Sequence, residues 1–146
     1  MGEEPVYEFT TINDAYVFML EAKGLPETKS GQIRKQRCVR ACILISWAAV
    51  EGCLEVALEL WNEKRSPFGP FPVPLKQRLT TVLKTLRKRN MNGAKYTRLR
   101  RIRNELTHPK PDKAGPKLTV KQAETTFAFC IATIRAFFPY RIELQF

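Results

Sequence analysis

The stretch from Gln32 to Glu63 constrains the fold more than any other part of the sequence. Apolar side chains recur in it every three or four residues, the spacing that places them along one side of an α-helix. These positions are Ile33, Leu44, Trp47, Val50, Leu54, Ala57, Leu58 and Trp61. A helix of this length needs neighbours that cover its apolar side, so the stretch predicts a helical bundle built around it.

The most apolar part of this helix, Ala41–Trp61, is long enough to span a bilayer, but it carries Glu51, Glu55 and Glu59. Carboxylates are costly in hydrocarbon, so we interpret the stretch as a core helix and expect no membrane contact. The first residues, MGEEPVYEF, lack the basic and apolar regions of a secretory signal. We therefore expect a soluble, cytoplasmic protein.

Four further segments are expected to be helical. Gly24 and Pro26 end a short first helix, and the turn Asn90-Met91-Asn92-Gly93 separates two later helices. Thr119 with Gln122 forms a capping box that begins the last helix. The expected ranges are 12–23, 75–89, 94–108 and 119–138. No alternating strand pattern is present, so the sequence predicts an all-α fold, a bundle of four main helices plus one short helix.

One domain is expected to span residues 1–146, because the chain is close to the commonest size of a single domain. Residues 66–74 hold four prolines in nine positions and cannot be helical. They are predicted to form a stiff connector whose Phe68 and Phe71 dock onto the bundle. Residues 139–146, after the last helix, are predicted to form a C-terminal tail.

The four cysteines, Cys38, Cys42, Cys53 and Cys130, lie within apolar helical stretches. We expect free, buried thiols, since a zinc site needs clustered Cys and His ligands and the chain has one histidine. No glycine-rich phosphate-binding loop and no Gly-x-Ser-x-Gly motif is present. The sequence therefore predicts no metal and no cofactor.

The formal net charge is +11, and the basic residues are concentrated in one block. From Lys64 to Asn104 there are 13 Lys or Arg residues and no Asp or Glu. Such a block attracts polyanions, nucleic acid above all. The alternative interpretation is a solvated basic surface that only keeps the protein soluble.

The one histidine, His108, closes the fourth expected helix, five residues after Arg103. Asn104 and His108 are i,i+4 partners on one side of that helix, while Arg103 is about 140° away from His108 around an ideal helix. Because Pro109 follows, His108 is biased away from helical backbone geometry and can turn toward a cleft. The alternative is that His108 only caps the helix and Arg103 pairs with an acidic neighbour.

The segment Arg103-Asn104-Glu105-Leu106-Thr107-His108 resembles the R-x4-6-H motif of the HEPN family (higher eukaryotes and prokaryotes nucleotide-binding). Members of that family are small helical bundles with the motif on a late helix, preceded by a long apolar helix. The resemblance implies metal-independent RNA cleavage in a homodimer that brings two motifs to one cleft. His108 would be the general acid or base, Arg103 would stabilise the phosphate, and Asn104 would donate an orienting hydrogen bond.

The same resemblance assigns Glu51 as an orienting partner of Arg103, because many HEPN proteins carry a Glu midway along the long helix. The acidic series Glu51, Glu55, Glu59 and Glu63 is otherwise interpreted as a solvated stripe or as ion pairs with the fourth helix. Trp47 and Trp61 are expected in the core or a dimer interface. The residues predicted to contact RNA are Lys84, Arg87, Lys88, Arg89, Arg98, Arg100 and Arg101, with Tyr96 either stacking on a base or packing half-buried.

The leading hypothesis is therefore an RNA endonuclease of HEPN type that leaves 2′,3′-cyclic phosphate ends and acts as a homodimer. By the resemblance, such an enzyme serves as a toxin or in defence against phage and has a neutralising protein partner. A second hypothesis is a HEPN-like bundle that binds RNA, nucleotide or protein without cleaving. A third is a helical interaction module with a merely solvated basic surface.

Overall fold

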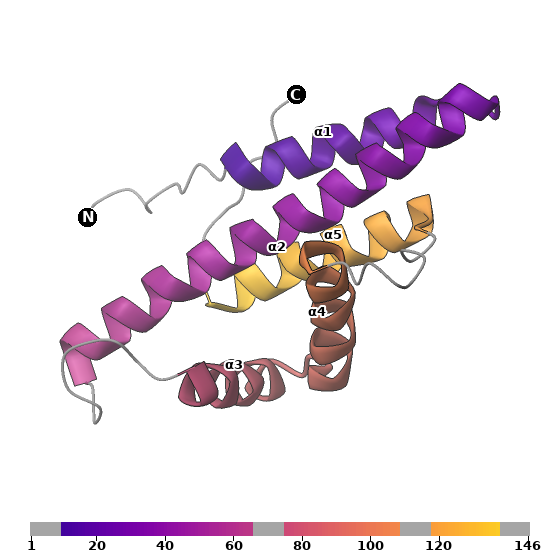
Figure 1. The fold of residues 1–146 in the computed structure, drawn as a ribbon. Helices are drawn as coiled ribbons and strands as arrows, with labels where there is room; N and C mark the ends of the chain where they lie inside the picture. The colour runs from indigo at the N-terminus through magenta and orange to yellow at the C-terminus, as the bar shows by residue number, and fades with distance from the viewer. Residues whose placement is uncertain (1–9, 66–74, 109–117, 138–146) are drawn as a thin grey trace.

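A computed structural model describes residues 10–65, 75–108 and 118–137, which form five α-helices and no strand (Figure 1). The helices are α1 (Thr10–Gly24), α2 (Lys29–Arg65), α3 (Leu75–Lys88), α4 (Gly93–Thr107) and α5 (Val120–Phe137). The predicted all-α bundle is thus confirmed, although α1 is as long as α4, at 15 residues each. The connector predicted at residues 66–74 and the tail predicted at 139–146 lie outside the described residues.

Helix α5 begins where its capping box was predicted. The Gln122 backbone N–H donates to Thr119 Oγ1 at 3.2 Å, and the Thr119 N–H donates to Gln122 Oε1 at 2.8 Å. Both groups would otherwise be unpaired at a helix start. The sequence alone therefore determines where this helix begins.

The turn between α3 and α4 is also built from local chemistry. Asn90 has a positive φ of 57°, a backbone conformation that Asn tolerates better than most residues. This lets the Met91 N–H donate to the Leu86 carbonyl at 2.8 Å, and the pattern is a Schellman motif that ends α3. Asn92 then accepts from the Lys95 N–H at 3.1 Å and caps the start of α4. The turn from Arg89 to Asn92 thus sets the direction in which α4 follows α3.

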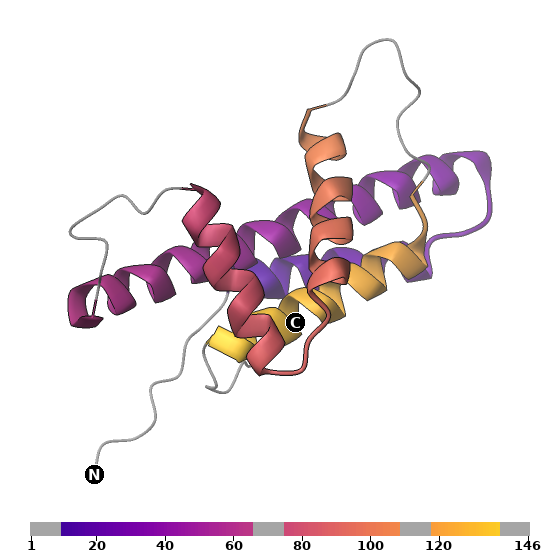
Figure 2. The ribbon, with the colours of Figure 1, turned by 90° about the horizontal axis from the view of Figure 1, so that it is seen from below.

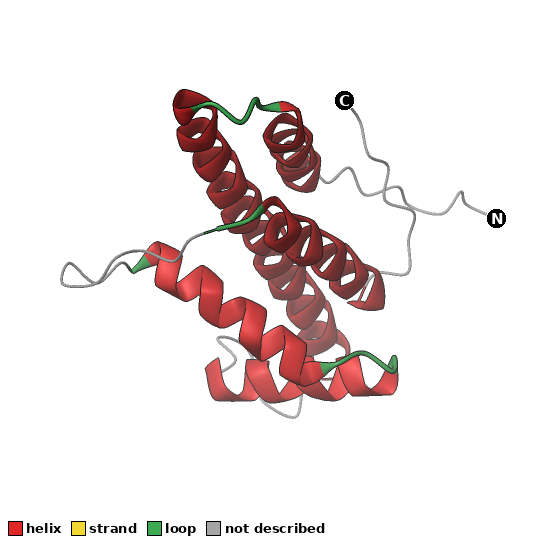
Figure 3. Ribbon diagram, turned by 90° about the vertical axis from the view of Figure 1, so that its right-hand side faces the viewer, coloured by secondary structure: helices red, strands yellow, loops and turns green. Residues whose placement is uncertain are grey.

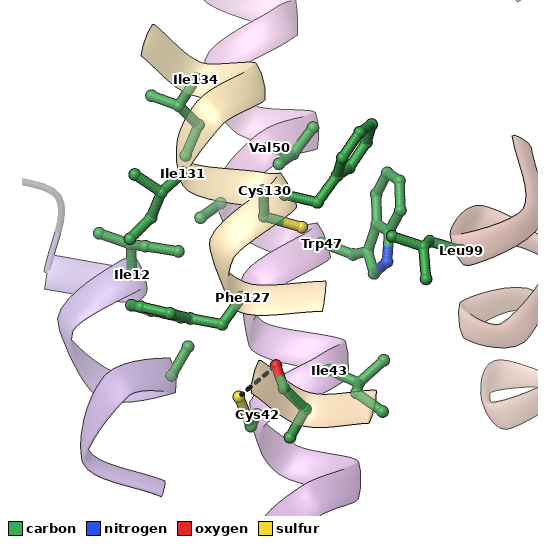
Figure 4. Packing of buried hydrophobic residues seen from close by; sticks show 14 of the residues in the cluster. Ile12, Cys42, Ile43, Trp47, Val50, Leu99, Phe127, Cys130, Ile131 and Ile134 are labelled. Carbon is green, nitrogen blue, oxygen red and sulfur yellow. Dashed lines mark hydrogen bonds between the residues drawn. The ribbon is translucent and has the colours of Figure 1, made fainter. Parts of the chain in front are cut away.

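Helix α2 is the centre of the core and packs most extensively against α1 and α5 (Figure 4). Its fully buried side chains are Val39, Cys42, Ile43, Ser46, Trp47 and Val50, which meet Ile12 and Ala15 of α1 and Cys130 and Ile134 of α5. The predicted apolar side of α2 is thus correct over its middle. Ile33 was wrongly included in it, since this side chain is 51% exposed. The side chains of residues 55–65 lie outside the described set.

A pair of amide hydrogen bonds joins α2 to the residue that precedes the α5 cap. The Leu118 backbone N–H donates to Gln36 Oε1 at 3.1 Å, and Gln36 Nε2 donates to the Leu118 carbonyl. Leu118 itself is 2% exposed, so its side chain anchors the same point in the core. Both contacts hold the first turn of α5 against α2.

Helices α3 and α4 lie together at one side of the layer formed by α1, α2 and α5 (Figures 2 and 3). Helix α4 contacts α2, whereas α3 contacts α4 and α5. The Tyr96 ring of α4 meets the Trp47 indole of α2 edge-on, with centroids 5.3 Å apart. Leu99, one turn further along α4, is also buried. These two side chains determine which side of α4 faces the bundle.

None of the described helices combines the length and the apolar character needed to cross a membrane. The four cysteines are free and buried, as predicted. Burial raises the pKa of the Cys42 thiol to about 11 and that of Cys53 to about 12. Thiolates form only slightly at neutral pH under these conditions, so the native thiols are poor nucleophiles and poor metal ligands.

The raised pKa of Cys53 makes stability fall at alkaline pH. An unfolded thiol has a pKa of about 8.5, so the stabilisation is complete below that pH and is lost as the unfolded chain ionises above it. Cys53→Ala should destabilise the protein at pH 8, and this deficit should shrink by about 1–2 kcal/mol at pH 10. Urea unfolding of wild type and Cys53→Ala at pH 8 and pH 10 measures this difference in the free energy of unfolding. Val50→Ala, an apolar truncation on the same helix, is the control and should lose the same stability relative to wild type at pH 8 and at pH 10. If the loss of stability in Cys53→Ala is also the same at both pH values, the prediction is wrong.

Candidate functional site

Helix α4 carries the candidate site because its two sides differ in chemistry. Its inner side is apolar: Tyr96 and Leu99 are buried, and Ile102 and Leu106 are partly buried against the core. Its exposed side chains are Thr97, Arg98, Arg101, Asn104, Glu105, Thr107 and His108. The helix thus presents cationic and hydrogen-bonding groups to solvent while its apolar side fixes its position.

Arg103 lies at the edge of the inner side and forms an ion pair with Glu51 of α2 through its Nη2 atom. The Arg103 side chain is 18% exposed and that of Glu51 is 46% exposed. Burial lowers the pKa of Arg103 below its ordinary value, but a guanidinium stays charged at neutral pH. The structure therefore brings together the two residues that the HEPN resemblance paired. An ion pair of Arg103 with an acidic neighbour is equally what the capping alternative expects.

The Arg103 Nε–H is buried and has no hydrogen-bond partner among the described residues. A guanidinium has five N–H donors, and the contact with Glu51 uses one of its nitrogens. Thr107 Oγ1 donates to the Arg103 carbonyl at 3.0 Å in the same turn of the helix. Arg103 is thus held in position by α2 while part of its donor capacity is unused.

His108 is the C-cap of α4. Its φ of −123° and ψ of 69° are outside the helical region, as expected before a proline, and its backbone N–H donates to the Asn104 carbonyl at 2.9 Å. The imidazole is exposed and has no hydrogen-bond partner among the described residues. It is therefore accessible to a ligand. Its backbone also caps the helix, which the alternative interpretation predicted.

Arg103 and His108 are not in contact within one chain. On an ideal helix five positions would place the two side chains about 140° apart, but His108 is already outside the helical region. Arg103 points toward α2, whereas Asn104 and His108 lie on the exposed side. One ligand atom can be reached from both only if the long Arg103 side chain turns, or if a second chain supplies one of the groups.

A pocket of about 170 Å³ lies between α3 and α4, and sequence reasoning did not anticipate it. It is lined by Leu79 of α3 and by Thr97, Arg100, Arg101 and Asn104 of α4. The four α4 residues are spaced as neighbours on one helix side, a pattern that was visible in the sequence. What the sequence did not reveal is that α3 would close the other wall with Leu79.

Tyr96 corrects the set of predicted RNA contacts. Its side chain is 4% exposed, and its ring contacts Trp47 at 5.3 Å and Phe129 at 6.4 Å between centroids. Burial raises the pKa of its hydroxyl, so the group stays neutral. A ring enclosed in this way cannot stack on a base. The packing alternative is therefore correct, because α4 docks this ring on Trp47.

The remaining predicted RNA contacts form two groups. Lys84, Arg87, Lys88 and Arg89 are exposed toward the end of α3, and Arg98, Arg100 and Arg101 lie along α4 with Arg100 partly buried. The end of α3 adjoins the start of α4, whereas His108 is at the other end, about 20 Å away at 1.5 Å per residue. Among the described residues, Arg100 and Arg101 form no ion pair.

Trp47, placed in the core or an interface by the sequence, is 1% exposed and belongs to the core. The side chains of Trp61, Glu55, Glu59 and Glu63 lie outside the described set. Over the described residues, no group of three or more His, Cys, Asp or Glu side chains is arranged to hold a metal ion. Comparison of the chain with protein-family models, with curated proteins and with solved structures finds no match.

The Glu51–Arg103 ion pair predicts a measurable coupling. Glu51→Gln should destabilise the protein by about 1–2 kcal/mol, between the values for exposed and buried pairs, because a largely buried guanidinium loses its counter-charge. Urea unfolding of Glu51→Gln, Arg103→Gln and the double variant measures this. The double variant should be clearly less destabilised than the sum of the single variants. Additive losses would mean that the two side chains do not interact.

Proposed function

We propose that the chain is a metal-independent RNA endonuclease of HEPN type that acts as a homodimer. The observation that supports this most is the position of His108. The only imidazole in the chain is exposed at the end of a helix whose other exposed side chains are cationic or hydrogen-bonding, with the exception of Glu105. An accessible imidazole beside groups that attract phosphate is the minimum that RNA cleavage without a metal requires.

The chemistry needs three contributions. A base takes the proton of the 2′-hydroxyl, an acid protonates the departing 5′-oxygen, and positive charge stabilises the phosphorane between these steps. An imidazole is suited to both proton transfers, and a guanidinium binds two phosphate oxygens while staying charged. His108 is assigned the proton transfers and Arg103 the phosphate, with Asn104 as an orienting donor.

The homodimer belongs to this proposal because one chain holds one histidine. Two His108 side chains in one cleft would supply base and acid together. The dimer also removes the difficulty that Arg103 of one chain is turned toward α2 while its His108 is exposed at the helix end. Arg103 of one chain and His108 of the other can then face the same phosphate. By its resemblance to the HEPN family, the activity would be that of a toxin or phage-defence effector with a neutralising protein partner in the cytoplasm.

A second candidate is a HEPN-like bundle that binds RNA or nucleotide without cleaving it. Arg103 favours this candidate, because its side chain is 18% exposed and its guanidinium is already paired with Glu51. A phosphate would have to compete with that carboxylate or use the remaining N–H groups. In this case the Glu51–Arg103 pair joins α2 to α4, and the exposed cations of α4 do the binding.

The test is incubation of a mixed-sequence RNA with wild-type and His108→Ala protein in EDTA. We expect cleavage by the wild type that leaves cyclic phosphate ends, and a loss of at least about 100-fold in rate for His108→Ala with RNA affinity nearly unchanged. Glu105→Gln, an exposed neighbour in the same helical turn, is the control and should still cleave. Light scattering at the assay concentration should report a dimer.

Two results separate the candidates. If neither protein cleaves any of several RNAs at high concentration, yet both bind RNA with steep salt dependence, the chain is the non-catalytic binder. If RNA binding is absent or varies little with salt, neither candidate stands and the basic surface serves another purpose. Cleavage that persists at full rate in His108→Ala would remove His108 from the mechanism.

A further inference from the structure

We propose that the pocket between α3 and α4 is a binding site for one phosphate group. This pocket, defined by Leu79, Thr97, Arg100, Arg101 and Asn104, lies apart from the Glu51–Arg103 pair. It goes beyond the proposed nuclease, because a phosphate site here serves the cleaving and the non-cleaving candidate equally. Its success or failure is therefore decided by binding, not by cleavage.

The donors in the pocket fit a phosphate. Arg100 and Arg101 each offer a planar fork of N–H groups, and Thr97 and Asn104 add a hydroxyl and an amide. Of the described residues, none that lines the pocket is acidic, and none forms an ion pair with Arg100 or Arg101. Four donor-bearing side chains without a carboxylate favour an anion, and guanidinium forks match the oxygens of a phosphate.

The size of the pocket limits what it holds. At about 170 Å³ it is below the roughly 300 Å³ at which pockets for drug-sized ligands begin. A phosphate with part of its sugar fits that volume, whereas a whole nucleotide does not. The Leu79 side chain supplies an apolar wall, which suits the carbon atoms of a sugar better than a second charged group. The ligand is therefore a phosphate that extends out of the pocket into solvent.

The pocket is aligned with His108 along α4. Thr97, Arg101 and Asn104 fall within about 60° of one another around the helix axis, and His108 follows Asn104 by four residues at the end of the helix. Arg101 and His108 are seven residues apart, about 10 Å along the axis. A phosphate held by Arg100 and Arg101 is consequently not the one beside the imidazole, and Asn104, which lines the pocket and is assigned to the nuclease site, lies between the two phosphates. On an RNA strand the phosphate in the pocket is a neighbouring phosphate, held while the strand runs toward His108.

The phosphate has two sources, an internal phosphate of RNA or the terminal phosphate of a free nucleotide, and the experiment separates them. Inorganic phosphate, AMP and a short RNA are titrated into isotope-labelled protein, and backbone amide resonances are followed by NMR. The RNA arm uses the His108→Ala protein so that the strand stays intact. We expect inorganic phosphate to shift the resonances of Thr97, Arg101 and Asn104 ahead of those elsewhere in the chain.

The decisive variant keeps the charge. Arg100→Lys with Arg101→Lys preserves both positive charges but removes both guanidinium forks. It should weaken phosphate binding about tenfold, whereas Arg135→Lys, an exposed arginine on α5, should have no effect. If the double variant also binds RNA about tenfold more weakly, the phosphate comes from an RNA strand. If its affinity falls for AMP and not for RNA, the phosphate comes from a free nucleotide. Binding that is unchanged in the double variant, or shifts confined to other parts of the chain, would overturn the phosphate site.

Discussion

The buried side of α2 is the surface on which the rest of the described structure depends. Helix α1 covers it on one flank and α5 on the other, and Trp47 extends it to α4 (Figure 4). The polar contacts at its edge follow from the same packing: Gln36 holds the start of α5, and Glu51 holds α4 through Arg103. Without this apolar contact area, none of these hydrogen bonds would outweigh the entropy of ordering the helices.

The orientation of α4 is the consequence that matters for function. Tyr96 and Leu99 are buried against the bundle, and an α-helix is rigid, so every other side chain of α4 takes a fixed direction from these two. Arg103 then faces α2, and His108 faces solvent. The Trp47 Nε1–H is buried and has no hydrogen-bond partner among the described residues, an unfavourable group at the centre of this contact. The aromatic packing of Trp47 with Tyr96 is therefore what holds α4 in place there.

Most of the fold followed from signals that act within a few residues. The periodicity of α2, the capping box of Thr119 with Gln122 and the Asn90 turn each have local causes, and each is confirmed. Ile33 was misplaced because it follows the apolar period near an end of α2, where no described helix covers it. Tyr96 was ambiguous because a tyrosine at helical spacing suits a core and a binding surface equally. Only the docking of α4 on Trp47 resolved that choice.

The candidate site was less accessible to the same reasoning. The contact between Glu51 and Arg103 was predicted from a family resemblance. Helical periodicity indicates which side of each helix is buried, but it does not indicate which residues of α2 and α4 meet, and these two residues are 52 positions apart in the sequence. The pocket required Leu79, which reaches α4 only after the turn from Arg89 to Asn92 has folded the chain back. Sequence patterns therefore describe one side of a helix well and the space between two helices poorly.

The geometry of α4 also decides what a nuclease built on this chain would have to be. Because Arg103 is turned toward α2 by Glu51 while His108 is exposed at the helix end, a monomer would have to break the Glu51–Arg103 ion pair to bring both side chains to one phosphate. That would leave Glu51 without its cation and the Arg103 guanidinium without support. Two copies can satisfy both needs, with each Arg103 still held by its own Glu51. The ion pair is thus compatible with catalysis by a dimer, and it argues against catalysis by a single chain.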